Sequence, residues 1–171
     1  MPPAAIDSLK RARSHRPEAI RQLSSARLAA LIRPAGFHHV KAARLKAVAD
    51  WWLDHGGYRT LGRLSTDTLR SGLLNVHGVG RETADVILLY VFERRVFVID
   101  AYARRVFSRI GLIDGDEPYE SLRGGIEEAF TGGTPGCNEY HALIVEHAKT
   151  HCRSKPLCSD CCLAAVCDYP A

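Results

Sequence analysis

The sequence has no apolar run long enough to span a membrane, and residues 1 to 5 lack the apolar core of a signal peptide. It also has no internal repeat and no low-complexity linker. We therefore expect a globular cytoplasmic protein, in a reducing compartment where a disulfide framework is disfavoured. At 171 residues the chain is long enough for one full core, or for two small lobes that share an interface.

The positive charge is unevenly distributed along the chain. The formal net charge is +4, and residues 1 to 60 hold eleven Lys and Arg against four Asp and Glu, whereas the remainder holds twelve against fifteen. Such a bias favours contact with an acidic partner. The basic face is therefore expected mainly in the N-terminal half.

The hydrophobic pattern is helical almost throughout. Residues 96 to 99 form the one candidate strand, and this run is too short to imply a sheet. Asp100 is placed to cap the helix that follows it. The expected helices cover residues 25–33, 38–54, 80–92 and 100–110, with others opening at residue 65 and after residue 136.

Four cysteines near the C-terminus form a metal-binding pattern, with intervals of five, two and five residues. Thiols clustered so closely in a reducing compartment favour metal ligation over disulfides. Four thiolates suit either zinc or an iron-sulfur cluster. The expected ligands are Cys152, Cys158, Cys161 and Cys167.

Two further cysteines need a separate interpretation. Cys162 adjoins Cys161 and would replace it as a ligand in a shifted register, but Cys161 preserves the five-residue interval to Cys167 and is preferred. Cys137 stands alone and is expected to be a small buried residue. The first loop of the cage carries Arg153 and Lys155, which point to nucleic acid as the partner.

A glycine-rich turn, Gly78-Val79-Gly80, precedes an apolar helix. Two glycines let the backbone approach an anion while the free N–H groups of the following helix point toward it. Such contacts hold DNA without reading its sequence. The same pattern also occurs in plain connections between helices, so the turn alone does not decide the function.

The wider stretch, Leu-Leu-x-Val-x-Gly-Val-Gly-Arg-x-Thr-Ala over residues 73 to 84, resembles the helix-hairpin-helix motif of the endonuclease III superfamily of DNA glycosylases. Residues 36 to 42 resemble the family's Gly-aromatic-x-x-x-Lys-Ala helix start, and residues 98 to 109 its catalytic segment. Residues 140 to 149 are similar to the helix that leads into its iron-sulfur loop. The cysteines are similar to its [4Fe-4S] ligand set, with a first interval one residue shorter than in endonuclease III.

This resemblance implies an all-α helix-hairpin-helix DNA glycosylase fold. A partial helical barrel is expected over residues 1–94, with the hairpin at about 66–92, and a lobe with the catalytic aspartate and a [4Fe-4S] cluster over residues 95–171. The family's opening helices have no counterpart before Ala4, so we expect either a misplaced start at Met1 or a real truncation. A nucleoid-associated monomer is expected.

The resemblance assigns catalysis to Asp100 and Glu82. A carboxylate at Asp100 would stabilise the oxocarbenium character of the sugar and orient or deprotonate water, and it can cap its helix as well. Bifunctional members carry a lysine where Glu82 stands, and a carboxylate cannot form their Schiff base. A glutamate there resembles the monofunctional 3-methyladenine glycosylases, whose alkylated purines are cationic. The alternative for Glu82 is a solvated first-turn residue favoured by the helix dipole.

The expected activity is base-excision repair: hydrolysis of the N-glycosidic bond of a damaged base, an alkylated purine, in double-stranded DNA. Alternatives are a non-catalytic iron-sulfur protein that senses damage, or an endonuclease III-type glycosylase for oxidised pyrimidines. Phe37 is either a wedge beside the extrahelical base or a core residue, and His141 and His147 are expected to serve packing or backbone hydrogen bonding. The expected DNA contacts are Gly78, Val79, Gly80, Arg81, Thr83, Arg153, Lys155 and Phe37.

Overall fold

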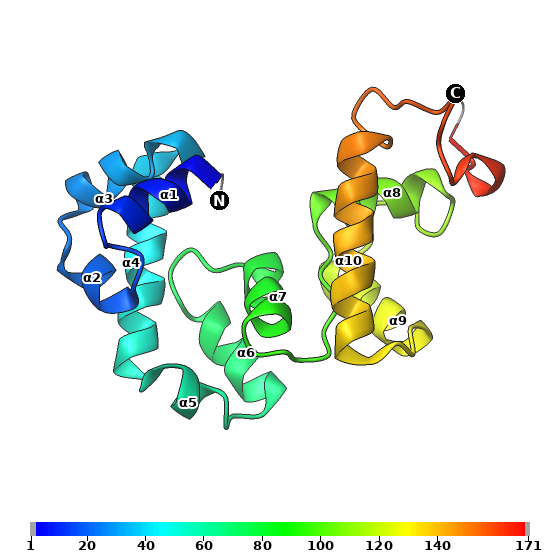
Figure 1. The fold of residues 1–171 in the computed structure, drawn as a ribbon. Coiled ribbons are helices and arrows are strands. Elements are labelled where there is room, and N and C mark those ends of the chain that lie inside the picture. Colours follow the sequence, from blue (N-terminus) through cyan, green and yellow to red (C-terminus); the bar gives the residue numbers. More distant parts are fainter. Residues whose placement is uncertain (1–2, 170–171) are drawn as a thin grey trace. The chain divides into compact units, whose positions relative to one another are not determined.

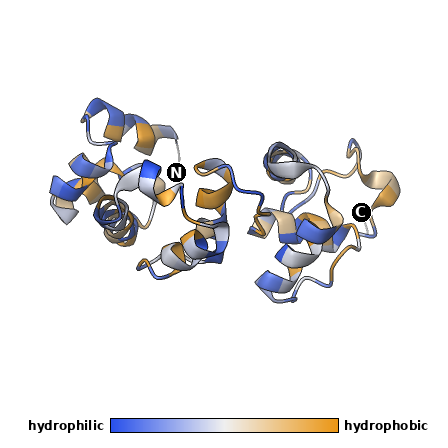
Figure 2. Ribbon diagram, turned by 90° about the horizontal axis from the view of Figure 1, so that it is seen from below, coloured by the Kyte–Doolittle hydropathy of each residue, from blue (hydrophilic) through white to orange (hydrophobic). Residues whose placement is uncertain are grey.

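The computed structural model describes residues 3–169, which form helices joined by loops, with no strand among them. The expected all-α fold is confirmed. The chain divides into two compact units, Met1–Gly80 and Arg81–Ala171. Apolar and polar residues lie side by side on the same helices, so both units are built from amphipathic helices (Figure 2). Within residues 3–169, no helix has the length and apolar character needed to cross a membrane.

The first unit is organised around one long helix, α4. Helices α2 and α3 pack against it, and Figure 1 shows these short helices beside the cyan α4. The buried cluster at this junction is made of small and aliphatic side chains, among them Leu28, Ile32 and Ala49. The elements are α1 (Pro3–Arg11), α2 (Pro17–Gln22), α3 (Ser25–Leu31), the short 3-10 helix η1 (Arg33–Ala35), α4 (His38–Asp54), α5 (Gly57–Leu61) and α6 (Thr66–Leu74).

Two lysines of α4 donate hydrogen bonds to backbone carbonyls within this unit. The Nζ atom of Lys46 donates to the carbonyl oxygens of Leu23 at 2.6 Å and Arg21 at 2.9 Å, which lie at the end of α2. The Nζ atom of Lys41 donates to the carbonyl oxygen of Ala35 at 2.5 Å. Since these amines satisfy backbone carbonyls at helix ends, the basic face of the N-terminal half has fewer free cations than its composition suggests.

The second unit is built on the packing of α8 against α10. Their shared core contains Phe97, Val106, Phe107 and Ile144, all buried. The elements are α7 (Arg81–Tyr90), α8 (Ala101–Arg109), α9 (Tyr119–Ala129), α10 (Gly133–Thr150) and the 3-10 helix η2 (Ala164–Val166). The helix after residue 136 that the sequence predicts therefore begins slightly earlier.

The candidate strand at residues 96–99 is wrong as a strand, although the segment is fully buried. The N–H of Val96 donates to the carbonyl of Arg94 at 2.9 Å, and the amides of Phe97 and Ile99 bond to side chains instead of a neighbouring strand. The N–H of Phe97 donates to Glu127 Oε1 at 2.8 Å, and the N–H of Ile99 lies 3.4 Å from Tyr119 Oη. These partners from α9 satisfy the buried amides, and the segment delivers Asp100 to the start of α8.

The structural division differs from the grouping that the sequence suggests. Helix α7 belongs to the unit that starts at Arg81, whereas the pattern groups residues 1–94 together. The functional domains 1–94 and 95–171 therefore stay a prediction.

Candidate active site

Asp100 caps α8 with one carboxylate oxygen. Its backbone is extended, with φ −87° and ψ 178°, and Oδ1 accepts the N–H of Ala103 at 2.7 Å. Ser, Thr, Asp and Asn favour this position because their side chains satisfy an N–H that the helix leaves free. The capping role is confirmed. The side chain is 13% exposed, and its second oxygen, Oδ2, is left for other partners.

That second oxygen faces a histidine from α10. The Nε2 atom of His141 lies 3.5 Å from Asp100 Oδ2 and has no hydrogen-bond partner within normal distance. On its other side, His141 Nδ1 lies 2.7 Å from the hydroxyl oxygen of Tyr90, at the end of α7. His141 is buried and its ring packs against Tyr90, as the packing interpretation expects, but the ring also bonds to one side chain and faces another.

The pKa values of two carboxyl groups, Asp100 and Glu82, shift in opposite directions. Burial pushes the pKa of Asp100 upward, but the nearby imidazole of His141 and the hydrogen bond from the Ala103 amide outweigh it, and the net pKa lies below the usual value. Glu82 has a raised pKa, mainly because surrounding protein removes water and further because of the charge on Asp100. Asp100 is therefore the carboxylate that stays ionised, and Glu82 is the one that takes up a proton more readily.

The glycine-rich turn gives its three residues different roles. Gly78 has φ +82°, and a Cβ atom there would collide with the side chain of Arg44. The side chain of Val79 is buried, and its N–H donates to the carbonyl of Val76 at 3.0 Å. A Cβ atom on Gly80 would meet nothing within 4 Å. The amide of Val79 is thus used inside the turn, while the space at Gly80 is open.

The remaining expected DNA contacts in this part of the chain lie on the surface. Arg81 and Thr83 are exposed on the first turn of α7, where Arg81 Nε pairs with Glu120 at 3.2 Å. Phe37 is 86% exposed and starts α4 with φ +46°. The core alternative for Phe37 is therefore wrong, and a bulky residue held in the left-handed region at an open site is unusual.

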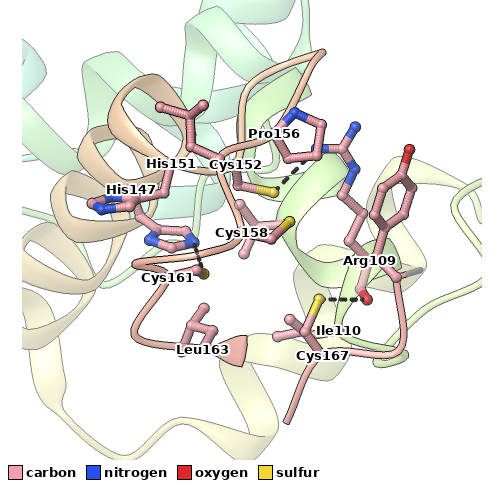
Figure 3. Close-up of a pocket in the computed structure, with 13 residues that line it drawn as sticks. Arg109, Ile110, His147, His151, Cys152, Pro156, Cys158, Cys161, Leu163 and Cys167 are labelled. Atoms are coloured by element: carbon pink, nitrogen blue, oxygen red, sulfur yellow. Dashed lines mark hydrogen bonds between the residues drawn. The ribbon is translucent and has the colours of Figure 1, made fainter. Parts of the chain in front are cut away.

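The four expected metal ligands line one pocket (Figure 3). It holds about 330 Å³ of empty space, part of it open to solvent, and apolar residues such as Ile110, Leu157 and Leu163 form much of its wall. Cys162 is exposed and is not part of this lining. Cys137 is fully buried in α10, as expected for a small core residue. Within residues 3–169, no group of three or more His, Cys, Asp or Glu side chains has a geometry that could hold a metal ion.

The side chains of this pocket suit a metal group that is held by cysteine sulfur atoms. Arg109 of α8 lies with Nη1 3.4 Å from Cys152 Sγ, and it donates to the carbonyl oxygens of Arg153 at 2.6 Å and Ser154 at 3.2 Å. Cys167 donates its S–H to the carbonyl of Arg109 at 3.2 Å. Arg109 is therefore a cation that lies beside a thiol sulfur of the pocket. The same arginine holds the loop on which Arg153 and Lys155 are exposed.

The contacts of Arg105, Arg109 and Tyr90 could not be predicted from the sequence. Besides Arg109, Arg105 donates to the carbonyl oxygens of Cys152 at 2.7 Å and Ala148 at 3.1 Å. The spacing of Arg105 and Arg109, one helical turn apart, places them on one face of α8. For Tyr90, no local pattern signals its contact with His141, because the two residues are 51 positions apart.

Three comparisons connect this geometry to known proteins. A Methanocaldococcus jannaschii protein that carries the provisional name DNA repair glycosylase is 44% identical over 144 residues, which is 82% of this chain and 66% of that protein. Endonuclease III of Sulfolobus acidocaldarius is 32% identical, over 81% of this chain and 60% of that protein. The chain thus spans somewhat less than two thirds of the length of these relatives.

Solved structures show the same fold at lower identity. A 3-methyladenine DNA glycosylase of H. pylori bound to 1,N6-ethenoadenine has a TM-score of 0.72 and 24% identity, with 85% of this chain and 75% of that chain covered. A non-covalent endonuclease III–DNA complex has a TM-score of 0.76 and 22% identity, with 94% and 73% covered. Residues 4–131 match the family described as HhH-GPD superfamily base excision DNA repair protein. The chain belongs to the HhH-GPD superfamily.

Proposed function

We propose that this protein is a monofunctional DNA glycosylase, which hydrolyses the N-glycosidic bond of a damaged base in duplex DNA and leaves an abasic site. The observation that carries the proposal is Asp100, a largely buried carboxylate whose pKa is held below its usual value. Cleavage of the bond develops positive charge on the sugar, and an ionised carboxylate stabilises that charge. Family membership supports the same assignment.

One oxygen of Asp100, Oδ2, faces His141 and is not used to cap α8. Its Oδ1 atom is committed to the N–H of Ala103, so Oδ2 is the oxygen left to face the sugar or the attacking water. A base inside the duplex must be flipped out of the stack before these groups can reach it. The water then adds to the sugar carbon while the bond to the base breaks, and the carboxylate takes or directs the proton of the water.

Glu82 supports hydrolysis without strand cleavage. It occupies the position at which the bifunctional enzymes of the resembled family use a lysine, and a carboxylate cannot attack the sugar to form a Schiff base. Its negative charge, when present, attracts a cationic base such as an N-alkylated purine more than a neutral one. The proposed substrate class is therefore the alkylated purines.

A release assay on defined duplexes tests this proposal. We expect free base from duplex DNA with an N-alkylated purine and little from DNA with a neutral oxidised pyrimidine. Glu82→Gln should lower that preference about fivefold, because two unit charges 4 Å apart in water interact by about 1 kcal/mol. Release of the pyrimidine in preference to the purine would favour the endonuclease III-type alternative. Binding without any release would favour the non-catalytic damage sensor.

We further propose that the turn at residues 78–80 holds DNA by its backbone. Gly80 supports this role because it is exposed, no protein atom lies near its absent side chain, and the first turn of α7 follows directly. The free N–H groups of a helix start attract phosphate. Arg81 and Thr83 would add side-chain contacts, and Val79 would hold the shape of the turn.

Gly80→Ala is the clean test of this grip. We expect weaker binding to damaged and undamaged duplexes alike, since phosphate contacts do not depend on sequence, while the melting temperature stays nearly unchanged. Gly78→Ala would instead disturb the turn through its positive φ and through Arg44. Gly124→Ala in α9, where a Cβ atom also meets nothing, is the matched control. Loss of affinity for damaged DNA only would contradict the proposed grip.

We propose that Cys152, Cys158, Cys161 and Cys167 hold a [4Fe-4S] cluster. The support is that all four line one pocket beside Arg109, whereas Cys162 is exposed and does not line it. When bound, the cluster would supply structural cross-linking of the C-terminal tail and no step of the hydrolysis. The loop between the first two cysteines would then present Arg153 and Lys155 to phosphates. We also propose that the protein acts as a monomer, in the cytoplasm and on the nucleoid.

A further inference from the structure

We infer that Tyr90, His141 and Asp100 form a chain of side-chain contacts that orients the Asp100 carboxylate, so that His141 is a positioning residue for base release. This inference rests on the proposed glycosylase function. The chain joins three elements of the second unit: the end of α7, the start of α8 and the middle of α10. Nothing in the local sequence around any of the three residues predicts it.

The geometry commits both nitrogens of the imidazole. His141 is buried, with 6% of its surface exposed. Its Nδ1 atom lies 2.7 Å from Tyr90 Oη, and its Nε2 atom lies 3.5 Å from Asp100 Oδ2. A buried ring nitrogen is costly to leave without a partner. Among the described residues, the carboxylate oxygen is the polar atom that faces this nitrogen.

Tyr90 determines which nitrogen of the neutral ring carries the proton. Burial, together with the negative charge of Asp100, raises the pKa of Tyr90, so its hydroxyl keeps its proton at neutral pH. That hydroxyl can donate to His141 Nδ1, which leaves the ring hydrogen on Nε2, directed at the carboxylate. In the opposite tautomer, the lone pair of Nε2 would face a negative oxygen, which is repulsive.

The arrangement fixes the carboxylate at both oxygens. The N–H of Ala103 holds Oδ1 at 2.7 Å, and His141 holds the side of Oδ2. The pKa of Glu82 is raised mainly by burial and further by the charge of Asp100. The groups that face Asp100 are therefore Glu82 and Tyr90 from α7 and His141 from α10, and His141 is the one that favours the ionised form.

Two substitutions of His141 test the inference. His141→Leu should lower the single-turnover rate of base release about 10- to 100-fold, in the range of a lost outer-shell partner, with DNA affinity changed less than about twofold. The acid limb of its pH–rate profile should move to higher pH, because Asp100 loses the group that favours its charge. His141→Gln, whose amide N–H can reach the position of Nε2, should restore most of the rate.

The controls separate positioning from simple stability. Ile144→Ala removes a buried side chain one turn further along α10 and should lower the melting temperature without moving the acid limb. If His141→Leu does not fold, Tyr90→Phe carries the test, because it removes one oxygen from a side chain that is 41% exposed. It should shift the acid limb in the same direction by a smaller amount.

A measurement that needs no activity distinguishes failure of this inference from failure of the proposed function. The pKa of the Asp100 carboxyl, followed by NMR of labelled protein, should be higher in His141→Leu than in the parent chain. This result would support the inference even if no lesion were released. An unchanged pKa of Asp100, or an acid limb that moves equally in Ile144→Ala, would overturn it.

Discussion

Replacing Asp100 with asparagine is expected to lower the rate of base release by at least about 100-fold, while DNA affinity stays within a few-fold of the parent value. The amide removes the charge that, in the proposed mechanism, stabilises the sugar in the transition state. Asparagine is also a good N-cap, so the bond to Ala103 and the start of α8 should survive. The single-turnover rate of base release and the affinity for the same damaged duplex are the two quantities to measure.

Two controls make the Asp100 result specific. Asp67→Asn removes one carboxylate from an exposed position in α6 and should leave release unchanged. Asp100→Ala removes both charge and cap, so it should lose activity as Asp100→Asn does and also about 1 kcal/mol of stability. If Asp100→Asn released the base at the parent rate, Asp100 would have no part in the chemistry.

The second large effect is expected at the cysteine pocket. Protein prepared without oxygen should be brown and contain about four iron atoms per chain, and Cys158→Ser should lose most of this iron and much of its solubility. The reason is that the described part of the tail, residues 151–169, has no helix except η2 and no buried residue, so the cluster would be its main support.

Cys162→Ser is the matched control, because it changes a thiol four residues away that does not line the pocket. Its iron content should equal that of the parent chain. Loss of iron in this variant would show that Cys162, and not Cys161, is the third ligand. Stoichiometric zinc without visible absorption in the parent chain would contradict the iron-sulfur assignment altogether.

The parts of the fold that follow local rules could be predicted from the sequence. Ser65 and Asp100 cap their helices with side-chain oxygens, as their residue types suggest. The helix at residues 38–54 ends before the glycine pair at Gly56, as expected. Such signals depend on neighbours within one helical turn, so a single sequence carries them.

The parts that depend on packing could not be predicted. The run at residues 96–99 has the composition of a strand, but only the folded unit reveals that Glu127 and Tyr119 bond to its amides. The same holds for His141, whose partners Tyr90 and Asp100 come from other helices. These contacts of His141 arise from the packing of α7, α8 and α10, and no periodicity in the sequence encodes that packing.

The glycine-rich turn could be predicted from the sequence only in part. The sequence marks residues 78–80 as one motif, whereas the structure gives a conformational reason only for Gly78 and none for Gly80. The missing side chain of Gly80 leaves room for a ligand to approach the backbone closely. This difference is what makes Gly80 the informative position for DNA binding.

The central claim, hydrolysis without a covalent intermediate, is tested most directly by borohydride trapping on a duplex that contains an N-alkylated purine. In the proposed assignment Glu82 takes the place of the Schiff-base lysine, so we predict that free base appears, that no protein–DNA adduct is trapped, and that strands break only after alkali. Efficient trapping of a covalent adduct by the parent chain, with strand cleavage before alkali, would contradict the account.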